Sequence, residues 1–147
     1  MTDTRIDDLV EIHALCARYL SYTARKVDDQ WLDVFTPDAE YSAFGAIYSL
    51  ERFPALLASA PPGQYIGNMP VVVIDDDTAT GIQHFMFIDQ ATHAMRLAWY
   101  SDEYRRTHDG WRIHRRSSTF LRKHGGFDSG IPHEPLADEQ GPAESRA

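Results

Sequence analysis

The sequence predicts an α+β fold in which helices pack against one face of a strongly bent, antiparallel sheet. Helix-like apolar spacing is concentrated in residues 4–60, whereas long alternating runs occupy residues 65–121. Within these runs, Asp109-Gly110 separates two aromatic-rich stretches, which is a strong hairpin signal. Helices and antiparallel strands that are separated along the chain pack as layers around one core. A sheet that bends around the first helix would enclose a pocket.

The first predicted helix can be capped by Asp3 or Thr4 and continues to Ala24. Apolar residues recur along it at helical spacing and predict one buried face. We expect His13, which lies on this face, to be a core histidine with satisfied hydrogen bonds. The predicted face consists of Ile6, Leu9, Val10, His13, Cys16, Ala17, Leu20 and Ala24.

A second, shorter helix is predicted to follow Asp28, which can cap it. Its inward side would carry Trp31, Leu32 and Phe35, and the turn-forming residues 36–38 would end it. A short strand over residues 39–44 should then place Tyr41 on one face of the sheet and Glu40 on the other.

A weaker helix is predicted between Ser49 and Ala60, with apolar anchors on one side. Pro54 would interrupt its hydrogen bonds or shift its start. The loop at residues 61–63 is rich in proline and glycine, so it should end the helical part of the chain. The anchors are Phe53, Leu56 and Leu57.

Four strand-like runs complete the predicted sheet. A strand over residues 65–74 ends at the acidic turn 75–77, and residues 78–89 pair back across it. Residues 95–107 and 111–121 form the hairpin around Gly110. Alternation places Arg96, Ala98, Tyr100 and Asp102 on one face of the first arm, and Arg116, Ser118 and Phe120 together on the second.

At 147 residues, the chain is long enough for one domain with a sizeable core. We expect residues 1–124 to form this domain and residues 125–147, which contain few apolar side chains, to form a loose tail. The net charge of −8 is a poor match for nucleic acid or an anionic membrane, so we expect neither partner.

Several other classes of protein are also disfavoured by the sequence. Cys16 is the single cysteine, which excludes an intrachain disulfide. The histidines lack the paired spacing of a zinc site, so we expect no metal and no cofactor. No apolar run approaches the ~18 residues that a membrane span needs, and no secretion signal is evident, so we expect a cytoplasmic protein.

Three segments of the chain resemble a known family. They are Arg18-Tyr19, the stretch from Trp31 to Ala39 that contains Phe-Thr-Pro-Asp-Ala, and the stretch from Tyr104 to Arg112 that contains Asp-Gly-Trp-Arg. They are similar to the SnoaL-like branch of the nuclear transport factor 2-like superfamily, whose members include scytalone dehydratase, ketosteroid isomerase, lindane dehydrochlorinase and the small subunit of aromatic-ring dioxygenases. The resemblance implies a cone-shaped roll, with the curved sheet wrapped around the N-terminal helices.

The resemblance carries over few of the family's catalytic groups. The aspartate and histidine of the dehydratases and dehydrochlorinases fall on Ala24 and Gln64, and the isomerase base falls near Ala43. None of these residues can take a proton at neutral pH. The tyrosine that stabilises an oxyanion in the isomerases matches Tyr19, and their second donor, a protonated aspartate, matches Asp102.

By the family's register, two arginines, Arg96 and Arg116, would face the interior of the cone. A buried guanidinium must be compensated, because an unpaired buried charge costs several kcal/mol. Asp89 or Asp102 could supply a structural ion pair. A carboxylate or enolate of a substrate could bind there instead, and the sequence leaves both alternatives open.

His84 is the residue whose ordinary pKa suits proton transfer. If Phe85 and Phe87 line the pocket, alternation places His84 on the opposite face of the sheet. Taken together, the candidate catalytic residues are Tyr19, His84, Asp102 and Arg116. The candidate substrate-binding residues are Leu20, Tyr41, Gln64, Phe85, Phe87, Arg96, Tyr100, Ser118 and Phe120.

Two functions fit this sequence. The first is a small cofactor-independent enzyme of the dehydratase, isomerase or cyclase type, acting on a hydrophobic cyclic or polyketide-like molecule. The second is a non-catalytic binding module or scaffold subunit that resembles the small subunit of the dioxygenases. Either would be a homo-oligomer, dimer or trimer, because an apolar face of the sheet needs covering. That face would contain Met86, Leu97, Trp99 and Ile113.

Overall fold

The computed structural model describes residues 4–122 and 127–128 of the chain. The predicted α+β class is confirmed: helices occupy the first part of this region and strands dominate the second. In chain order the elements are α1 (Thr4–Arg25), α2 (Asp28–Leu32), β1 (Phe35–Ala43), β2 (Ala46–Ser49), the 3-10 helix η1 (Leu50–Arg52), α3 (Phe53–Ser59), β3 (Gly63–Gly67), β4 (Val71–Asp75), β5 (Thr78–Asp89), β6 (Met95–Thr107), β7 (Gly110–Leu121) and β8 (Phe127–Asp128).

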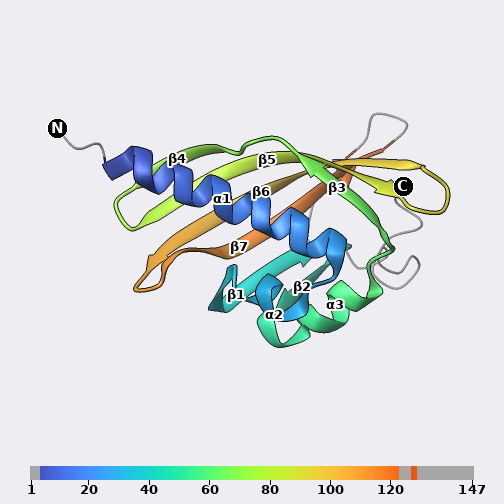
Figure 1. Cartoon of the computed structure of the whole chain (residues 1–147), viewed down its shortest axis with the longest axis horizontal. Coiled ribbons are helices and arrows are strands. Elements are labelled where there is room, and N and C mark those ends of the chain that lie inside the picture. The colour runs from blue at the N-terminus through green and yellow to red at the C-terminus, as the bar shows by residue number, and fades with distance from the viewer. Residues whose placement is uncertain (1–3, 123–126, 129–147) are drawn as a thin grey trace.

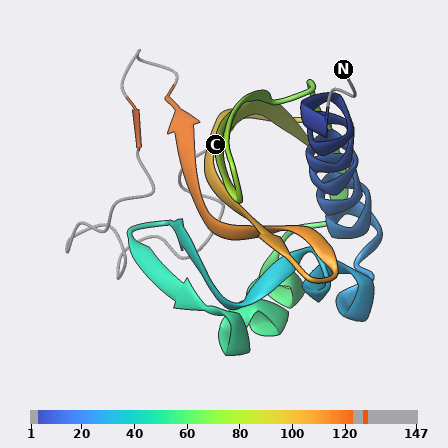
Figure 2. The ribbon, with the colours of Figure 1, turned by 90° about the vertical axis from the view of Figure 1, so that its left-hand side faces the viewer.

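The eight described strands form one sheet in the order β2-β1-β7-β6-β5-β3, with β4 also paired to β5 and β8 to β7. β1 runs parallel to β7, and the other described pairs are antiparallel. The sheet curls into an arc, and α1 lies along its open side (Figure 2). In Figure 1, α1 crosses the sheet diagonally, while α2 and α3 lie beside β1 and β2 at one end. This is the predicted cone, whose concave face looks onto α1.

The buried face of α1 overlaps the predicted one only in part, because Cys16 and Leu20 are buried as expected. Ile12 and Leu15 are completely buried, whereas Ile6 and Val10 are 58% and 61% exposed. The buried side begins at Asp8, which binds groups of β6 and β7. Contacts with the sheet therefore shift the buried side of α1 away from Ile6 and Val10.

The chain changes from helix to strand earlier than predicted. Helix α2 ends at Leu32, and Phe35 already pairs with β7, so the proposed helix stop at residues 36–38 is wrong. Pro37 lies exposed inside β1, within the stretch between Phe35 and Glu40 where the pairing with β7 shifts register. Because that stretch makes no regular ladder, a residue without an N–H group is tolerated there.

Two predicted elements are divided in the structure. The weak helix over residues 49–60 is preceded by β2 and consists of η1 and α3, with Pro54 in the first turn of α3, where its missing N–H costs nothing. The long strand over residues 65–74 is divided into β3 and β4. Between them, Asn68 donates its N–H to the carbonyl of His84 and accepts the N–H of His84 through Oδ1.

The β6–β7 hairpin is confirmed and contains an irregularity that the sequence did not reveal. Thr107 pairs with Gly110, whose φ is +102°, as expected for the tight turn. Further along, Glu103 pairs with Arg115 but Tyr104 pairs with Ile113, which leaves one extra residue on β7 and defines a β-bulge. Ile113 is therefore fully buried, and its predicted place on the outer face is wrong.

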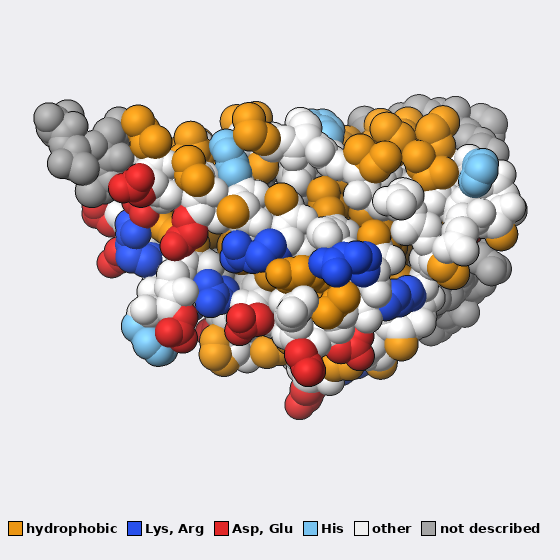
Figure 3. Space-filling view, in the orientation of Figure 1, with side chains coloured by type: hydrophobic (Ala, Val, Ile, Leu, Met, Phe, Trp, Pro, Cys, Tyr) orange, Lys and Arg blue, Asp and Glu red, His pale blue; other side chains and the backbone are white. Residues whose placement is uncertain are grey.

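An apolar surface remains on the convex side of the sheet. Register places Val71 beside Ile82, and Met86 beside both Ile66 and Leu97. Hydrophobic side chains lie along the upper margin of the molecule in Figure 3, where β4 and β5 lie in Figure 1. We call this surface the outer apolar face. It comprises Ile66, Val71, Ile82, Met86, Leu97 and Trp99.

We expect the protein to form a homodimer or homotrimer that buries the outer apolar face. Leu97→Arg should then give a monomer in size-exclusion chromatography with light scattering, because it places a charge in the interface. Val10→Arg makes the same change at a similarly exposed residue of α1, outside this face, and should leave the mass unchanged. A monomeric wild-type chain would contradict the expectation.

Two remaining expectations concern the ends and the environment of the chain. The predicted tail, residues 125–147, lies outside the described residues except for 127–128, whose backbone forms β8 beside β7. Among the described helices, none combines the length and the apolar character needed to cross a membrane.

Candidate active site

A small cavity lies between the concave face of the sheet and the helices. Its volume is about 60 Å³, below the roughly 150 Å³ of a cavity that accepts benzene. The interior of the cone is thus largely filled by side chains, and a ring-sized ligand requires movement of the wall. The lining consists of Tyr19, Thr23, Trp31, Tyr41, Phe44, Leu56, Leu57, Ser59, Ala60, Pro61, Tyr65, Phe85, Phe87, Arg96, Tyr100 and Phe120.

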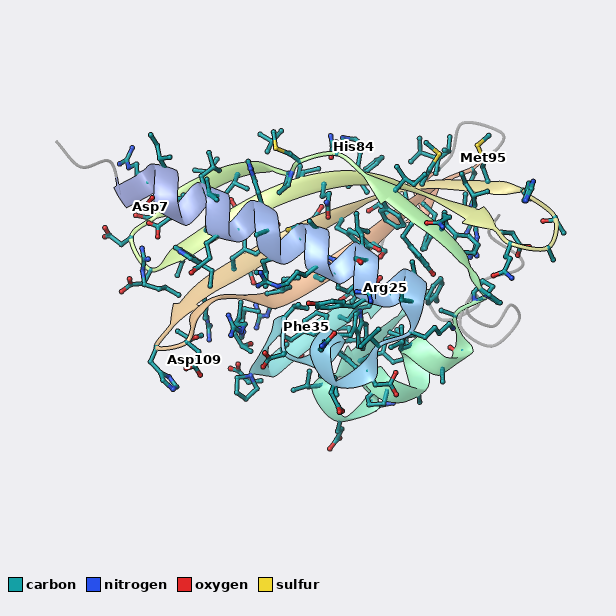
Figure 4. The ribbon with its side chains drawn as sticks, viewed as in Figure 1. Asp7, Arg25, Phe35, His84, Met95 and Asp109 are labelled. Carbon is teal, nitrogen blue, oxygen red and sulfur yellow. The ribbon has the colours of Figure 1, made fainter. Side chains whose placement is uncertain are left out.

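Tyr19 is fixed in this wall by aromatic neighbours from three elements, α2, β1 and β6. Its ring lies 5.8 Å from the rings of Trp31 and Phe35 and 5.5 Å from that of Tyr100, measured between centroids. The contacts with Phe35 and Tyr100 are edge-to-face, the favoured geometry for aromatic pairs. In Figure 4, Phe35 lies in this cluster, below the C-terminal half of α1. These contacts therefore hold the ring of Tyr19 in one orientation.

Arg116 lies behind this wall and is completely buried with Asp102. Arg116 Nε donates to Asp102 Oδ1 and Nη2 to Oδ2, each at 2.7 Å, in the bidentate geometry that guanidinium and carboxylate favour. The guanidinium also lies between the rings of Tyr19 and Tyr100, 4.1 and 3.9 Å from their centroids. Burial alone would lower the pKa of Arg116, but the contact with Asp102 reverses this effect and raises it. The arginine is therefore paired within the protein.

A second layer of contacts holds the carboxylate of Asp102. Tyr104 donates its hydroxyl to Asp102 Oδ2 at 2.7 Å, and this hydroxyl is 3.3 Å from the sulfur of Cys16. Burial raises the pKa of the Cys16 thiol to about 11, so it stays protonated at neutral pH. Asp102 thus accepts three hydrogen bonds and does not line the cavity, so we assign it to the ion pair rather than to oxyanion stabilisation.

Burial keeps three phenols of the cavity, those of Tyr41, Tyr65 and Tyr100, protonated. Burial raises the pKa of Tyr41, with a further increase from the neighbouring Tyr19, and the Tyr41 hydroxyl lies 2.7 Å from Ser118 Oγ. Burial likewise raises the pKa values of Tyr65 and Tyr100. At neutral pH these groups can donate hydrogen bonds but cannot act as bases.

The outer wall of the cavity is supplied by α3 and the residues that follow it. Lys26, which has a positive φ, donates from Nζ to the carbonyl of Leu57 at 2.8 Å and also to that of Ala60. Leu57 and Ala60 both line the cavity, so these hydrogen bonds hold the outer wall of the cavity against the end of α1.

Part of this lining was predicted from the sequence. Seven of the predicted residues surround the cavity: Tyr19, Tyr41, Phe85, Phe87, Arg96, Tyr100 and Phe120. Ser118 does not line it but fixes the Tyr41 hydroxyl from behind, as Arg116 supports the ring of Tyr19. These residues come together because alternate positions of β5, β6 and β7 face inward.

Three other candidates lie elsewhere. His84 is exposed on the convex side, with its ring 5.8 Å from that of Trp99, and Figure 4 shows it at the upper margin, away from Phe35. Leu20 and Gln64 line a separate open groove between α1 and β3, which also contains Ala24. Ala24 and Gln64, which the sequence resemblance matches to the family's aspartate and histidine, therefore line this groove and not the cavity.

Several lining residues were not predicted. The sequence predicts only that Trp31 and Leu57 are inward anchors of their helices and that Tyr65 begins a strand. Their apolar spacing indicated burial but not a shared cavity. The pairing of β3 with β5 places Tyr65 beside Phe87, a long-range contact that the local sequence does not encode.

The cavity offers few groups that could bind a metal ion. Its lining contains neither histidine nor carboxylate. Over residues 5–122, no three His, Cys, Asp or Glu side chains lie close enough to hold a metal ion. The chemistry of this site therefore rests on phenols, hydroxyls and one guanidinium.

Comparisons with known proteins agree with this geometry. A model of the SnoaL-like domain family matches residues 4–117. An uncharacterised protein of Mycobacterium tuberculosis is 34% identical, with 78% of this chain and 86% of that protein covered. The chain therefore belongs to the SnoaL-like family, as its motifs predicted.

Solved structures extend the similarity to the fold. An NTF2-like protein of Novosphingobium aromaticivorans with a cystatin-like fold gives a TM-score of 0.74 at 23% identity, covering 82% of this chain and 86% of that one. A candidate scytalone dehydratase from that organism gives 0.73 at 16%, covering 98% and 100%. The type 3 hexachlorocyclohexane dehydrochlorinase of Novosphingobium barchaimii gives 0.70 at 18%, covering 89% and 97%. At these identities the similarity concerns the fold, which hosts more than one chemistry.

Proposed function

We propose that this protein is a small cofactor-independent enzyme of the dehydratase, isomerase or cyclase type. Its substrate would be a hydrophobic cyclic molecule that enters the cavity of the cone and places a carbonyl oxygen against Tyr19. The observation that carries the proposal is the rigid, buried phenol of Tyr19 in an otherwise largely aromatic wall. Similarity to structures of a dehydrochlorinase and a candidate dehydratase supports this class of reaction.

In this proposal Tyr19 donates a hydrogen bond to the oxygen that becomes negative as an enolate forms. A donor that is already oriented in a water-poor site stabilises such a charge without reorganisation. Arg116 acts behind it as a positioning residue, because its guanidinium contacts the ring of Tyr19 and is occupied by Asp102. Since no base lines the cavity, the proton would be transferred by the substrate itself or by water.

A second candidate is a non-catalytic binding module. The composition of the lining favours it, because neither histidine nor carboxylate faces the cavity. In that case the same phenols would fix the oxygen of a bound ligand without chemical change. Both candidates require the cavity to bind a small cyclic ligand, and they differ in whether a bond to hydrogen is broken there.

Enolisation distinguishes the two candidates. We expect the wild-type protein to accelerate exchange of the α-protons of cyclohexanone or 2-indanone in D₂O, followed by proton NMR. Tyr19→Phe should reduce this acceleration about 100-fold, the usual loss when one oxyanion donor is removed. The matched control is Tyr22→Phe, one turn further on the same helix and outside the lining, which should leave exchange unchanged.

Calorimetric binding of the same ketones completes the test. Binding without accelerated exchange would replace the enzyme with the binding module. Equal exchange rates for the wild-type and Tyr19→Phe proteins would remove the proposed role of Tyr19. If neither ketone nor any other small cyclic molecule binds, both the enzyme and the binding module are ruled out.

A further inference from the structure

The turn between β1 and β2 has an unusual residue at its first position. It consists of Phe44 and Gly45, and both have a positive φ, +54° and +78°. Ala43 and Ala46 pair across the turn, as in a two-residue hairpin turn of type I′. Asparagine, aspartate or glycine usually occupies the first position, because a bulky side chain is strained at positive φ. Phe44 therefore carries a conformational cost that the turn itself does not require.

The ring of this strained residue forms part of the cavity wall. Phe44 lines the cavity and stacks on Phe120, another lining residue, with ring centroids 5.4 Å apart and an angle of 24° between the planes. Residues that persist in a strained backbone conformation are concentrated at binding and catalytic sites. The strain at Phe44 therefore points to a role of its side chain in the cavity.

Phe44 is held by fewer contacts than the large aromatic residue at the opposite end of the sequence range, Trp31. Trp31 contacts three other rings and donates its indole N–H to Thr23 Oγ1 at 2.8 Å. Within residues 5–122, Phe44 has one aromatic contact, the one with Phe120. Phe44 is also half-buried, so the cavity extends close to the surface of the molecule at this residue. A cyclic ligand would therefore displace the ring of Phe44 more easily than that of Trp31.

The small volume of the cavity makes the space occupied by this ring important. A cavity of about 60 Å³ does not admit a benzene-sized molecule while Phe44 remains in place. Removal of the phenyl group would add its volume to a cavity whose lining is largely apolar, and such cavities accept apolar ligands. In apolar pockets, ligands are distinguished mainly by size, because a surplus group meets the wall. Phe44 is therefore placed to decide which rings fit.

We propose that Phe44 is a specificity-determining residue of this cavity, whose ring disfavours fused bicyclic ligands relative to monocyclic ones. This inference rests on the proposed function, since it assumes that the cavity binds a small cyclic molecule. It goes further by naming the residue that selects among cyclic molecules by size. The strained turn holds the ring over Phe120, and a ligand enters by displacing it.

Calorimetric titration of the full-length protein with cyclohexanone and 2-indanone, a monocyclic and a bicyclic ketone, tests the inference. Phe44→Ala should tighten binding of 2-indanone relative to cyclohexanone at least about tenfold, a usual size of steric discrimination in an apolar pocket. Phe44→Trp fills more space and should shift the ratio of the two dissociation constants in the opposite direction. Phe44→Asn removes the ring but suits the turn, so it should shift the ratio as far as Phe44→Ala and unfold at a higher temperature than that variant.

Tyr48→Ala is the matched control. It removes another half-buried ring from the same hairpin, outside the cavity lining, and should leave the ratio unchanged. An unchanged ratio in Phe44→Ala, or the same shift in Tyr48→Ala, would overturn the inference while leaving ring binding, and with it the proposed function, intact. Binding of a ketone by Phe44→Ala but not by the wild-type protein would support the inference. If neither the wild-type protein nor any variant binds either ketone, the inference is ruled out together with the proposed function. Thermal unfolding of each variant shows whether it remains folded.

Discussion

Replacing Asp102 with alanine is expected to lower the free energy of unfolding by about 3–5 kcal/mol, the usual cost of leaving one partner of a buried ion pair alone. The change removes the carboxylate that takes two hydrogen bonds from the fully buried Arg116. Contacts with the rings of Tyr19 and Tyr100 remain, but they do not replace a full opposite charge. Urea unfolding followed by circular dichroism gives the change in free energy.

Two further variants distinguish the contribution of the buried Asp102–Arg116 ion pair from that of its neighbouring hydrogen bond. Tyr104→Phe removes a single hydrogen bond to the same carboxylate and should cost about 1 kcal/mol. The double variant Asp102→Leu with Arg116→Met removes both charges and should recover most of the stability lost in Asp102→Ala. If Asp102→Ala lowers the free energy of unfolding by less than about 1 kcal/mol, the pair behaves like a solvent-exposed ion pair. That result would contradict the burial of the two charges.

The second large effect is expected at Asp8, where the first turns of α1 meet the hairpin. Its carboxylate accepts the indole N–H of Trp111 at 2.9 Å and two N–H groups of Arg106. Asp8→Ala should destabilise the protein by about 2–3 kcal/mol, mostly because the buried indole loses its acceptor. The ion pair adds less, because the side chain of Arg106 is 39% exposed and screened by water.

The same contacts make part of the stability depend on pH. The hydrogen bonds from Arg106 and Trp111 lower the pKa of Asp8 below its ordinary value. The stabilisation is therefore complete above the unfolded-state pKa of about 3.9, and it is lost as the pH falls through the lower value of the folded state. Unfolding curves between about pH 5 and pH 2 should show this loss.

Asp8→Asn provides the control for this pH dependence. Its amide keeps an oxygen for the Trp111 indole but does not titrate, so the variant should lose less stability than the wild-type protein on acidification. An equally steep decrease in both proteins would assign the acid sensitivity to other carboxylates.

The buried ion pair also matters for the candidate site. Arg116 supports the ring of Tyr19 from one side, while Trp31 and Phe35 contact it from others. Loss of Asp102 should therefore disturb both the stability of the cone and the position of the proposed donor. Tyr19→Phe changes the donor alone, which is why it is the cleaner test of chemistry.

The fold was largely predictable because its signals are local. The spacing of apolar residues in α1, the alternation in β6 and the Asp-Gly turn before Trp111 each depend on residues close in sequence. The boundaries were less predictable. Phe35 was assigned to a helix because it continues an apolar pattern, yet it pairs with Ile113 of β7, which is distant in sequence.

The candidate site was predictable in part for the same reason. Alternation correctly placed Phe85, Phe87 and Tyr100 on the inner face, and it placed His84 opposite them. It could not show that Arg116 pairs with Asp102 whereas Arg96 lines the cavity. Both arginines have the inward parity, and only their depth in the cone separates their roles.

By itself, the sequence determined the α+β class, the SnoaL-like family and the inward-facing residues of the long strands, because periodicity and turn chemistry act over a few residues. The tertiary structure decided the buried side of α1, the extra residue at His114 that turns Ile113 inward, and the partner of each buried charge. These features depend on which surfaces meet across the cone, and that is set by long-range packing rather than by local pattern.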